Sequence, residues 1–173
     1  IILNALKDGK NVILIGPPGS GKTYLAKRVA EDYSEKFEGN GFILYTVHSG
    51  TDYFDLVARI IPFVDEDGKL IYKKEKRYFL EALIDKKVLI LDEINRTQID
   101  TALGIFFTYI EKEHRESDPD AKKILNQIKK EIDLNAEYPE MSEESKALEI
   151  IKDRLKFFRV IGTLNIYDKT FLF

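Results

Sequence analysis

The stretch GPPGSGKT, residues 16–23, decides the fold of this 173-residue chain. It fits the pattern G-x-x-x-x-G-K-[ST] and lies between an apolar run, NVILI at 11–15, and an amphipathic stretch, TYLAKRVAEDY at 23–33. A loop of this kind between a buried strand and a helix binds phosphate. Its glycines let the backbone turn N–H groups inward, and the helix N-terminus adds positive potential. The stretch therefore predicts an α/β fold with a nucleotide held at this loop, rather than a glycine-rich turn with an incidental lysine.

The individual loop residues have expected tasks. Lys22 is expected to reach the β and γ phosphates of ATP or GTP, and Thr23 to offer its hydroxyl to Mg²⁺. In the helix that follows, Leu25, Ala26 and Val29 are expected to share the buried face. The predicted nucleotide-binding residues are Gly16, Pro17, Pro18, Gly19, Ser20, Gly21, Lys22, Thr23 and Tyr24.

Two carboxylates follow the apolar run VLIL at 88–91. In a parallel sheet, ligands gather at the carboxyl ends of the strands, so Asp92 and Glu93 are expected beside the loop. Asp92 then joins Thr23 as a Mg²⁺-binding residue, and Glu93 orients and polarises the attacking water. Acidic residues at the end of a strand can also be ordinary surface residues with no catalytic role. The phosphate-binding pattern at 16–23 favours the functional interpretation of Asp92 and Glu93.

A third apolar stretch, FFRVIGTLN at 157–165, ends in Asn165. Its neutral amide could contact the γ-phosphate or the water without repelling either, and the alternative is an asparagine that only forms a turn. With this residue, the predicted catalytic set is Glu93, Lys22 and Asn165.

The remaining elements are expected from their periodicity. FILYTV at 42–47 predicts a strand, YFDLVARI at 53–60 a short helix, and residues 61–74 a hairpin around the turn DEDGK. Further helices are expected at 77–87 and 97–112. The charged stretch 112–156 predicts two amphipathic helices, either solvated and laid on the domain or forming a surface for a partner.

Composition restricts the class of protein. Hydrophobic residues make up 44% of the chain and charged residues 33%, which fits one globular domain. A net charge of −3 gives no basic excess of the kind that suggests nucleic-acid binding. The absence of cysteine excludes disulfides and thiolate metal sites, and no apolar run approaches a membrane span. These features predict a cytoplasmic protein without a membrane segment.

Four segments together resemble the AAA+ domain of McrB-type GTPases, the motor subunits of modified-cytosine restriction systems. They are GPPGSGKT, VHSGTDYFDLV at 47–57, LILDEINR at 89–96 and VIGTLNIYDKT at 160–170. DEINR also occurs in MoxR-like and dynein-related AAA+ proteins. The resemblance implies a parallel sheet of order 5-1-4-3-2 flanked by helices, with the fifth strand and a helical lid beyond Phe173, so that residues 1–173 form a partial nucleotide-binding core.

The resemblance also implies partners. It suggests a homo-oligomeric ring, most simply a hexamer, together with a McrC-like nuclease subunit and DNA reached through regions outside this chain. The alternatives are a MoxR-like or dynein-related ATPase that remodels proteins, and a nucleotide-gated scaffold with little turnover. Preference for GTP is suggested only by the family.

Two further residues have open roles, and two features depart from the family pattern. His48 could hold Glu93 away from water, or could be an ordinary surface histidine. Arg96 could reach a neighbouring subunit, or could form a local salt bridge. Lys169 stands where the family usually has an arginine, and lysine cannot reproduce a bidentate arginine contact. The insertion at about 112–156 is longer than the connection typical of the family.

Overall fold

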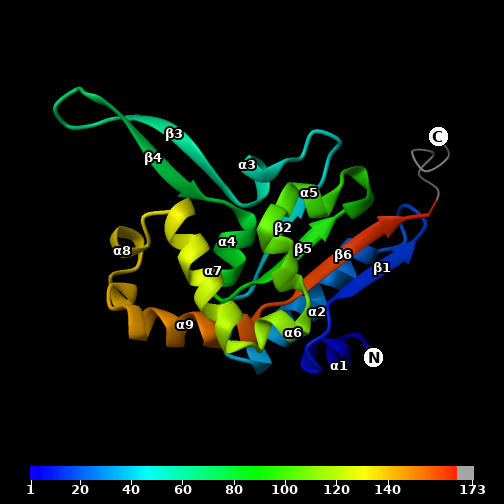
Figure 1. Ribbon diagram of the computed structural model, residues 1–173. Coiled ribbons are helices and arrows are strands. Elements are labelled where there is room, and N and C mark those ends of the chain that lie inside the picture. The colour runs from blue at the N-terminus through cyan, green and yellow to red at the C-terminus, as the bar shows by residue number, and fades with distance from the viewer. Residues whose placement is uncertain (167–173) are drawn as a thin grey trace.

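The computed structural model describes residues 1–166, and a four-stranded parallel sheet organises them (Figure 1). Across the sheet the strands run β1 (Val12–Gly16), β6 (Val160–Asn165), β5 (Val88–Asp92) and β2 (Phe42–Thr46). Counted along the predicted sheet strands, this order is 1-4-3-2, which confirms the predicted order for the strands described. The fifth strand and the lid, expected beyond Phe173, lie outside the described residues.

Helices cover both faces of the sheet, and β5 shows why its residues form a buried strand. Val88 and Ile90 pack on the side of α1 (Ile2–Lys7) and α2 (Lys22–Lys36). Leu89 and Leu91, which alternate with them, pack on the side of α4 (Tyr78–Ile84) and α9 (Glu144–Phe157). All four are at most 1% exposed. Burial of each such side chain contributes about 1.5–3 kcal/mol, so both layers of helices hold this strand in place.

The helix after the loop packs through a different face from the one predicted. Ala26, Ala30 and Tyr33 are its buried apolar residues, whereas Leu25 is 43% exposed. The prediction for Leu25 was therefore wrong. The buried stripe follows the spacing of four and three residues from Ala26, and Leu25 lies to one side of it.

A two-stranded antiparallel hairpin leaves the body of the domain (Figure 1). Its strands are β3 (Ala58–Val64) and β4 (Leu70–Lys76), which confirms the predicted hairpin. The helix expected at 53–60 stops early, as α3 (Tyr53–Leu56), because the chain enters β3 at Ala58 and pairs with β4. At its base the hairpin is tied to the domain by Lys76, which hydrogen-bonds to the Tyr138 hydroxyl and pairs with Asp85 and Glu137.

The helix predicted at 97–112 is broken at Gly104. An α-helix, α5 (Ile99–Leu103), ends there, and a 3₁₀ segment, η2 (Gly104–Ile110), continues the chain. Gly104 has φ +53° and ψ −133°, a conformation that only glycine adopts readily. The apolar spacing of this segment predicted a helix but could not show the break, and its buried residues are Ala102, Leu103, Phe106 and Tyr109.

The charged stretch 112–156 folds as helices that contribute to the core. Its elements are α6 (Lys112–Arg115), α7 (Asp118–Glu131), α8 (Leu134–Glu137), the 3₁₀ turn η3 (Pro139–Met141) and α9. The two predicted helices correspond to α7 and α9, although α7 ends before Ile132. Their buried apolar residues belong to the larger of two hydrophobic clusters: Ala121, Ile124, Leu125, Ile128, Ala147, Ile151 and Leu155. The stretch is therefore packed into the domain through one side and is not merely laid on it.

Two buried arginines, Arg115 and Arg159, lie at the end of the sheet opposite the 16–23 loop. Arg159 donates to the carbonyls of Leu6, Lys156 and Phe158, and Arg115 donates to those of Gly9 and Phe158. These carbonyls belong to the C-terminal ends of α1 and α9 and to the turns after them, where a cation is favoured. Burial, and next the charge of Arg159, lower the pKa of Arg115 to about 10, so the guanidinium stays charged at neutral pH.

No helix within residues 1–166 is both long enough and apolar enough to cross a membrane.

Candidate functional site

The carboxyl ends of β1, β5 and β6 meet at one edge of the sheet, where a cavity of about 350 Å³ opens. The register pairs Gly16 with Asn165 and Thr46 with Asp92, so the ends of the strands lie level. This alignment brings together segments far apart in sequence. The cavity is lined by Pro18, Gly19, Ser20, Gly21, Lys22, Thr23, Tyr24, Asp92, Glu93, Thr163 and Asn165.

The loop residues form one wall of this cavity. Gly19 and Gly21 have φ values of +74° and +82°, which turn the backbone sharply before α2 begins at Lys22. The Lys22 ammonium lies over the loop and donates to the Gly16 carbonyl at 3.0 Å, to the Pro17 carbonyl at 2.7 Å and to the Ser20 hydroxyl at 3.3 Å. The loop thus presents a helix N-terminus and a cation to the same space, an arrangement that attracts phosphate.

Asp92 is held by two hydroxyl groups from different elements. Thr23 donates to Asp92 Oδ1 at 2.7 Å, and Thr163 donates to the same oxygen at 2.5 Å. These hydrogen bonds to a carboxylate are charge-assisted and therefore stronger than neutral ones. They fix the carboxylate at the base of the cavity, directly beside the first turn of α2.

Glu93 adopts an unusual backbone conformation that points its carboxylate across the cavity. Its φ is +57°, and its N–H donates to the Thr163 hydroxyl at 3.0 Å. One carboxylate oxygen accepts from the Asn165 amide at 3.0 Å, and the other accepts from Arg96 Nε at 2.8 Å. Arg96 belongs to the 3₁₀ turn η1 (Ile94–Arg96), which begins directly after Glu93. A non-glycine residue at positive φ is costly, and such strain is typical of functional positions.

The residues present fit a magnesium ion bound together with a nucleotide. The Thr23 hydroxyl and the Asp92 carboxylate are hard oxygen ligands 2.7 Å apart. Mg²⁺ usually takes one or two carboxylates plus phosphate oxygens and keeps several waters. Among residues 1–166 no cluster of three or more His, Cys, Asp or Glu side chains could hold a metal, so a metal here would depend on ligands from the nucleotide.

The structure brings together every predicted site residue, in two ways. The residues Pro18 to Tyr24, Asp92, Glu93 and Asn165 line the cavity. Gly16 and Pro17 do not line it but supply the carbonyls that hold Lys22. Tyr24 is 71% exposed at the rim. Lys169, which departs from the family pattern, lies outside the described residues.

His48 and Arg96 take local positions. His48 Nδ1 accepts from the Gly50 N–H at 3.2 Å, and its Nε2 lies 3.2 Å from the Tyr45 hydroxyl. It therefore orders the loop after β2 and is not the partner of Glu93 in this conformation. Arg96 forms a salt bridge with Glu93 of its own chain. Of the two roles that the sequence left open for Arg96, this is the local salt bridge.

Sequence reasoning missed Thr163, although it is the residue that joins the two acids. Its hydroxyl contacts both the Asp92 side chain and the Glu93 backbone, and the residue is 1% exposed. The available signal was a hydroxyl residue two positions before Asn165 in an otherwise apolar strand. Side chains at this spacing point to the same side of a strand, so Thr163 and Asn165 face the same acids.

Comparison with known protein families matches residues 11–171 of the chain to the profile described as AAA domain, dynein-related subfamily. This match covers far more than half of the sequence and includes both the 16–23 loop and the acidic pair.

Individual curated proteins are similar as well. The chain is 30% identical over 118 residues to the type IV methyl-directed restriction enzyme EcoKMcrB subunit of Escherichia coli K12, covering 66% of this chain and 25% of that protein. It is 24% identical over 169 residues to the ATP-dependent protease ATPase subunit HslU of Pseudothermotoga lettingae, covering 92% of this chain and 35% of that protein. It is 43% identical over 70 residues to the ATP-dependent zinc metalloprotease FtsH of Helicobacter felis, covering 35% of this chain and 11% of that protein. The chain thus spans about a quarter to a third of the first two relatives.

Proposed function

We propose a function for this chain from one premise: it belongs to the AAA domain family, in the dynein-related subfamily. The function is binding and hydrolysis of a nucleoside triphosphate as part of a larger motor. The observation that carries this proposal is the convergence of Lys22, Thr23, Asp92, Glu93 and Asn165 on one cavity at the sheet edge.

In this proposal the loop and its cations hold the phosphates. Backbone N–H groups of the loop and the N-terminus of α2 bind the β and γ phosphates, and Lys22 exchanges its carbonyl partners for phosphate oxygens. Thr23 and Asp92 hold Mg²⁺, which when bound neutralises charge that develops on the phosphates. The two hydroxyl groups that donate to Asp92 hold its carboxylate in a fixed orientation for that task.

Glu93 is the proposed acceptor of the proton of the attacking water. Its carboxylate is oriented by Asn165 and Arg96, one on each oxygen. In hydrolysis the water oxygen forms a bond to the γ phosphorus, the bond to the leaving oxygen breaks, and Glu93 orients the water and receives its proton. Asn165 is neutral, so it can contact the water or the γ-phosphate without repelling either.

We further propose that the whole protein resembles a McrB-type motor. The similarity to a restriction-enzyme subunit supports a motor that moves along DNA with a McrC-like nuclease partner, assembled as a homo-oligomeric ring. The proposed nucleotide is GTP or ATP.

The similarity to HslU and FtsH supports a second candidate, an ATPase that remodels proteins. These relatives are named as parts of ATP-dependent proteases, so a motor core of this kind can also serve protein substrates. The HslU similarity spans most of this chain, which keeps the second candidate open.

One set of measurements on the full-length protein separates these functions. Phosphate release with Mg²⁺ and either ATP or GTP tests hydrolysis, and absence of release from both would leave only a nucleotide-gated scaffold. Displacement of a third strand from a DNA triplex tests movement along DNA, whereas unfolding of a tagged fluorescent protein tests remodelling. We expect triplex displacement. Unfolding without triplex displacement would overturn the restriction-type proposal and favour the second candidate.

A further inference from the structure

The β3–β4 hairpin carries an exposed apolar face that no described part of the chain covers. The register places Pro62 opposite Tyr72 and Val64 opposite Leu70, so these residues share one face. Val64 is 59% exposed, Leu70 55% and Tyr72 70%. An isolated two-stranded ribbon is marginal in water, and an exposed apolar patch on a projecting element marks an interaction surface.

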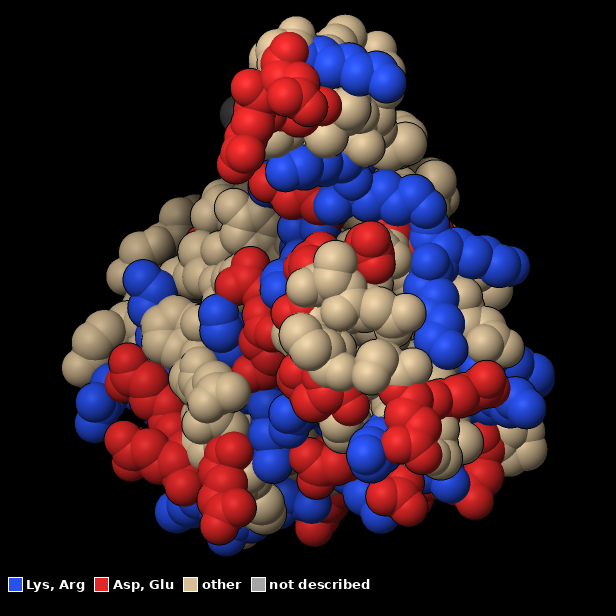
Figure 2. All heavy atoms as spheres, turned by 90° about the vertical axis from the view of Figure 1, so that its left-hand side faces the viewer, with Lys and Arg blue, Asp and Glu red and all other residues tan. Residues whose placement is uncertain are grey.

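The tip of this hairpin is acidic. It consists of Asp65, Glu66, Asp67, Gly68 and Lys69, between Val64 and Leu70, and so carries three carboxylates and one ammonium. Asp65 shapes the turn, because its carboxylate accepts from the N–H groups of Asp67 and Lys69. Glu66 and Asp67 form no ion pair within residues 1–166. Figure 2 shows acidic side chains gathered at the projecting end of the molecule, above a band of basic ones.

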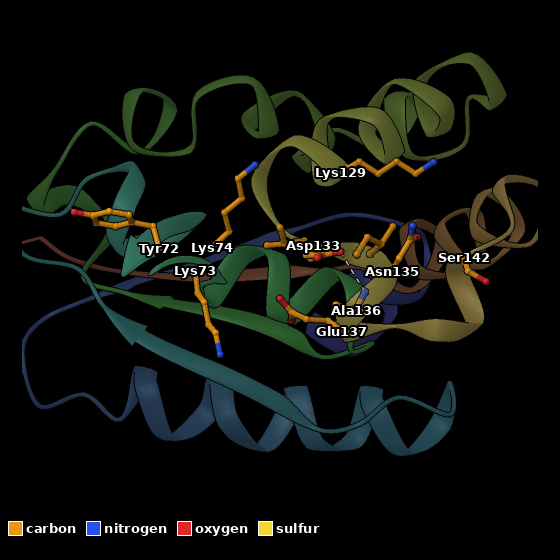
Figure 3. A pocket seen from close by; sticks show the side chains of 11 residues that line it. Tyr72, Lys73, Lys74, Lys129, Asp133, Asn135, Ala136, Glu137 and Ser142 are labelled. Carbon is orange, nitrogen blue, oxygen red and sulfur yellow. Dashed lines mark hydrogen bonds between the residues drawn. The ribbon is translucent and has the colours of Figure 1, made fainter. Parts of the chain in front are cut away.

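A groove of about 790 Å³ lies at the base of the hairpin and has the opposite charge (Figure 3). It separates β4 from the segment that joins α7 to α9. Lys73, Lys74 and Lys129 line it, and none of the three forms an ion pair within the described residues. Lys74 donates to the Lys130 carbonyl, and Lys73 lies over the Phe63 ring.

The carboxylates of the groove are already occupied. Asp133 accepts from the Ala136 N–H at the start of α8, and Glu137 pairs with Lys76 at 3.3 Å. Apolar residues complete the lining, with Tyr72 from the hairpin and Ile132 and Leu134 from the opposite side. The groove is therefore cationic with an apolar part, which complements an acidic segment flanked by apolar residues.

We propose that the acidic tip of one copy of this chain inserts into the lysine-lined groove of a second copy. The tip supplies Glu66 and Asp67 for the lysines, and Val64 and Leu70 for the apolar lining. A tip cannot reach the groove of its own chain, because β3 is seven residues long and the ladder with β4 keeps the tip roughly 20 Å from the base.

Such a contact joins two different surfaces of the same molecule. It is therefore head-to-tail, and a head-to-tail contact builds either a closed ring or an open filament. The inference rests on the assembly included in the proposed function, but it does not depend on which nucleotide or substrate the motor uses. Nucleic acid suits the surface less well, because the acidic tip repels phosphates and Tyr72 alone of the described groove lining could stack on a base.

Cysteine cross-linking tests the contact directly. The chain contains no cysteine, so Glu66→Cys and Lys129→Cys each introduce a single thiol, with any cysteine elsewhere in the full-length protein replaced by serine. We expect a disulfide-linked dimer when the two variants are mixed with nucleotide, and little from either variant alone. Absence of this dimer in samples shown to be assembled by light scattering would overturn the proposal.

Charge reversal provides a second test that does not depend on disulfide geometry. Glu66→Lys with Asp67→Lys, and separately Lys74→Glu with Lys129→Glu, should each weaken assembly about tenfold, and combining all four changes should restore it. Lys122→Glu is the matched control, because it places the same change two turns away on the exposed side of α7.

The same variants distinguish the proposal from its rivals. Nucleotide binding by each variant, measured by calorimetry, reports on the 16–23 site alone. A defect in the proposed hydrolysis can therefore be told apart from a defect in the contact between copies. Loss of oligothymidine binding in the lysine variant, with assembly unchanged and no rescue by the combined variant, would mean that the groove binds nucleic acid and would overturn the proposal.

Discussion

Replacing Thr163 by valine removes one hydroxyl and keeps the shape of the side chain. In the native protein that hydroxyl donates to the Asp92 carboxylate at 2.5 Å and accepts from the Glu93 N–H at 3.0 Å. The residue is 1% exposed, so water does not readily replace either bond. Valine therefore leaves a partly buried N–H without a partner and takes one of two hydroxyl donors from Asp92.

The cost follows from these two losses. A hydrogen bond to a charged group contributes about 1.5–3 kcal/mol, and an unsatisfied buried donor costs about 1–3 kcal/mol. Part of this is offset because valine is easier to bury, so we expect a net destabilisation of about 3 kcal/mol. For a domain of this size that lowers Tm by roughly 6–12 °C. Misplacement of Asp92 and Glu93 should also reduce turnover, by as much as about a hundredfold.

Thermal unfolding and phosphate release on the full-length protein measure these two effects. Thr163→Ser is the control, because it keeps the hydroxyl and loses only a methyl group, at about 1 kcal/mol. It should retain most of the turnover. If the valine variant matched the serine variant in both stability and turnover, the hydroxyl would not organise the acids and the reasoning would be refuted.

Three further variants test other parts of the molecule. Lys22→Ala should abolish binding of ATP and GTP in calorimetry while the melting curve stays nearly unchanged, and unaltered affinity for both would contradict the site. Glu93→Gln should retain nucleotide binding and lower phosphate release by roughly a hundredfold or more, whereas near-normal release would remove this residue from the mechanism. Arg159→Met should lower the free energy of unfolding in urea by about 3 kcal/mol, because the carbonyls of Leu6 and Lys156 lose their donor. An unchanged urea midpoint would show that water replaces the guanidinium as the donor.

The sheet and the loop could be predicted because strong local signals specify them. Uninterrupted apolar runs predicted β1 and β5 as strands, and the glycine pattern at 16–23 has a narrow physical purpose. The expected burial on both faces is confirmed for β5 but is wrong for β1, which lies at the edge of the described sheet and leaves Ile13 54% and Ile15 62% exposed. The position of Asp92 followed from the rule that parallel strands carry ligands at their carboxyl ends. These inferences needed no knowledge of distant contacts.

The remainder depended on contacts that a single sequence does not display. Leu25 was assigned to the buried face because it lies beside Ala26 and four residues before Val29, and only packing against the sheet shows where the buried stripe ends. The break at Gly104 depends on a backbone angle, since glycine is also tolerated within helices. Thr163 was missed because its two partners, Asp92 and Glu93, are 71 and 70 positions away in the sequence.

The junction between α9 and β6 connects the 112–156 stretch to the strand that reaches the site. Only Phe158 and Arg159 separate the last residue of the helix from the first residue of the strand, and both are buried. Arg159 ties this corner to the end of α1 by its bond to Leu6. The helix and the strand are consequently joined by a short, buried connection at this corner. Lys74 anchors the hairpin to α7, and Lys76 anchors it to Tyr138. A path of contacts thus runs from the hairpin through α7 and α9 to the strand that holds Thr163 and Asn165 beside the two acids.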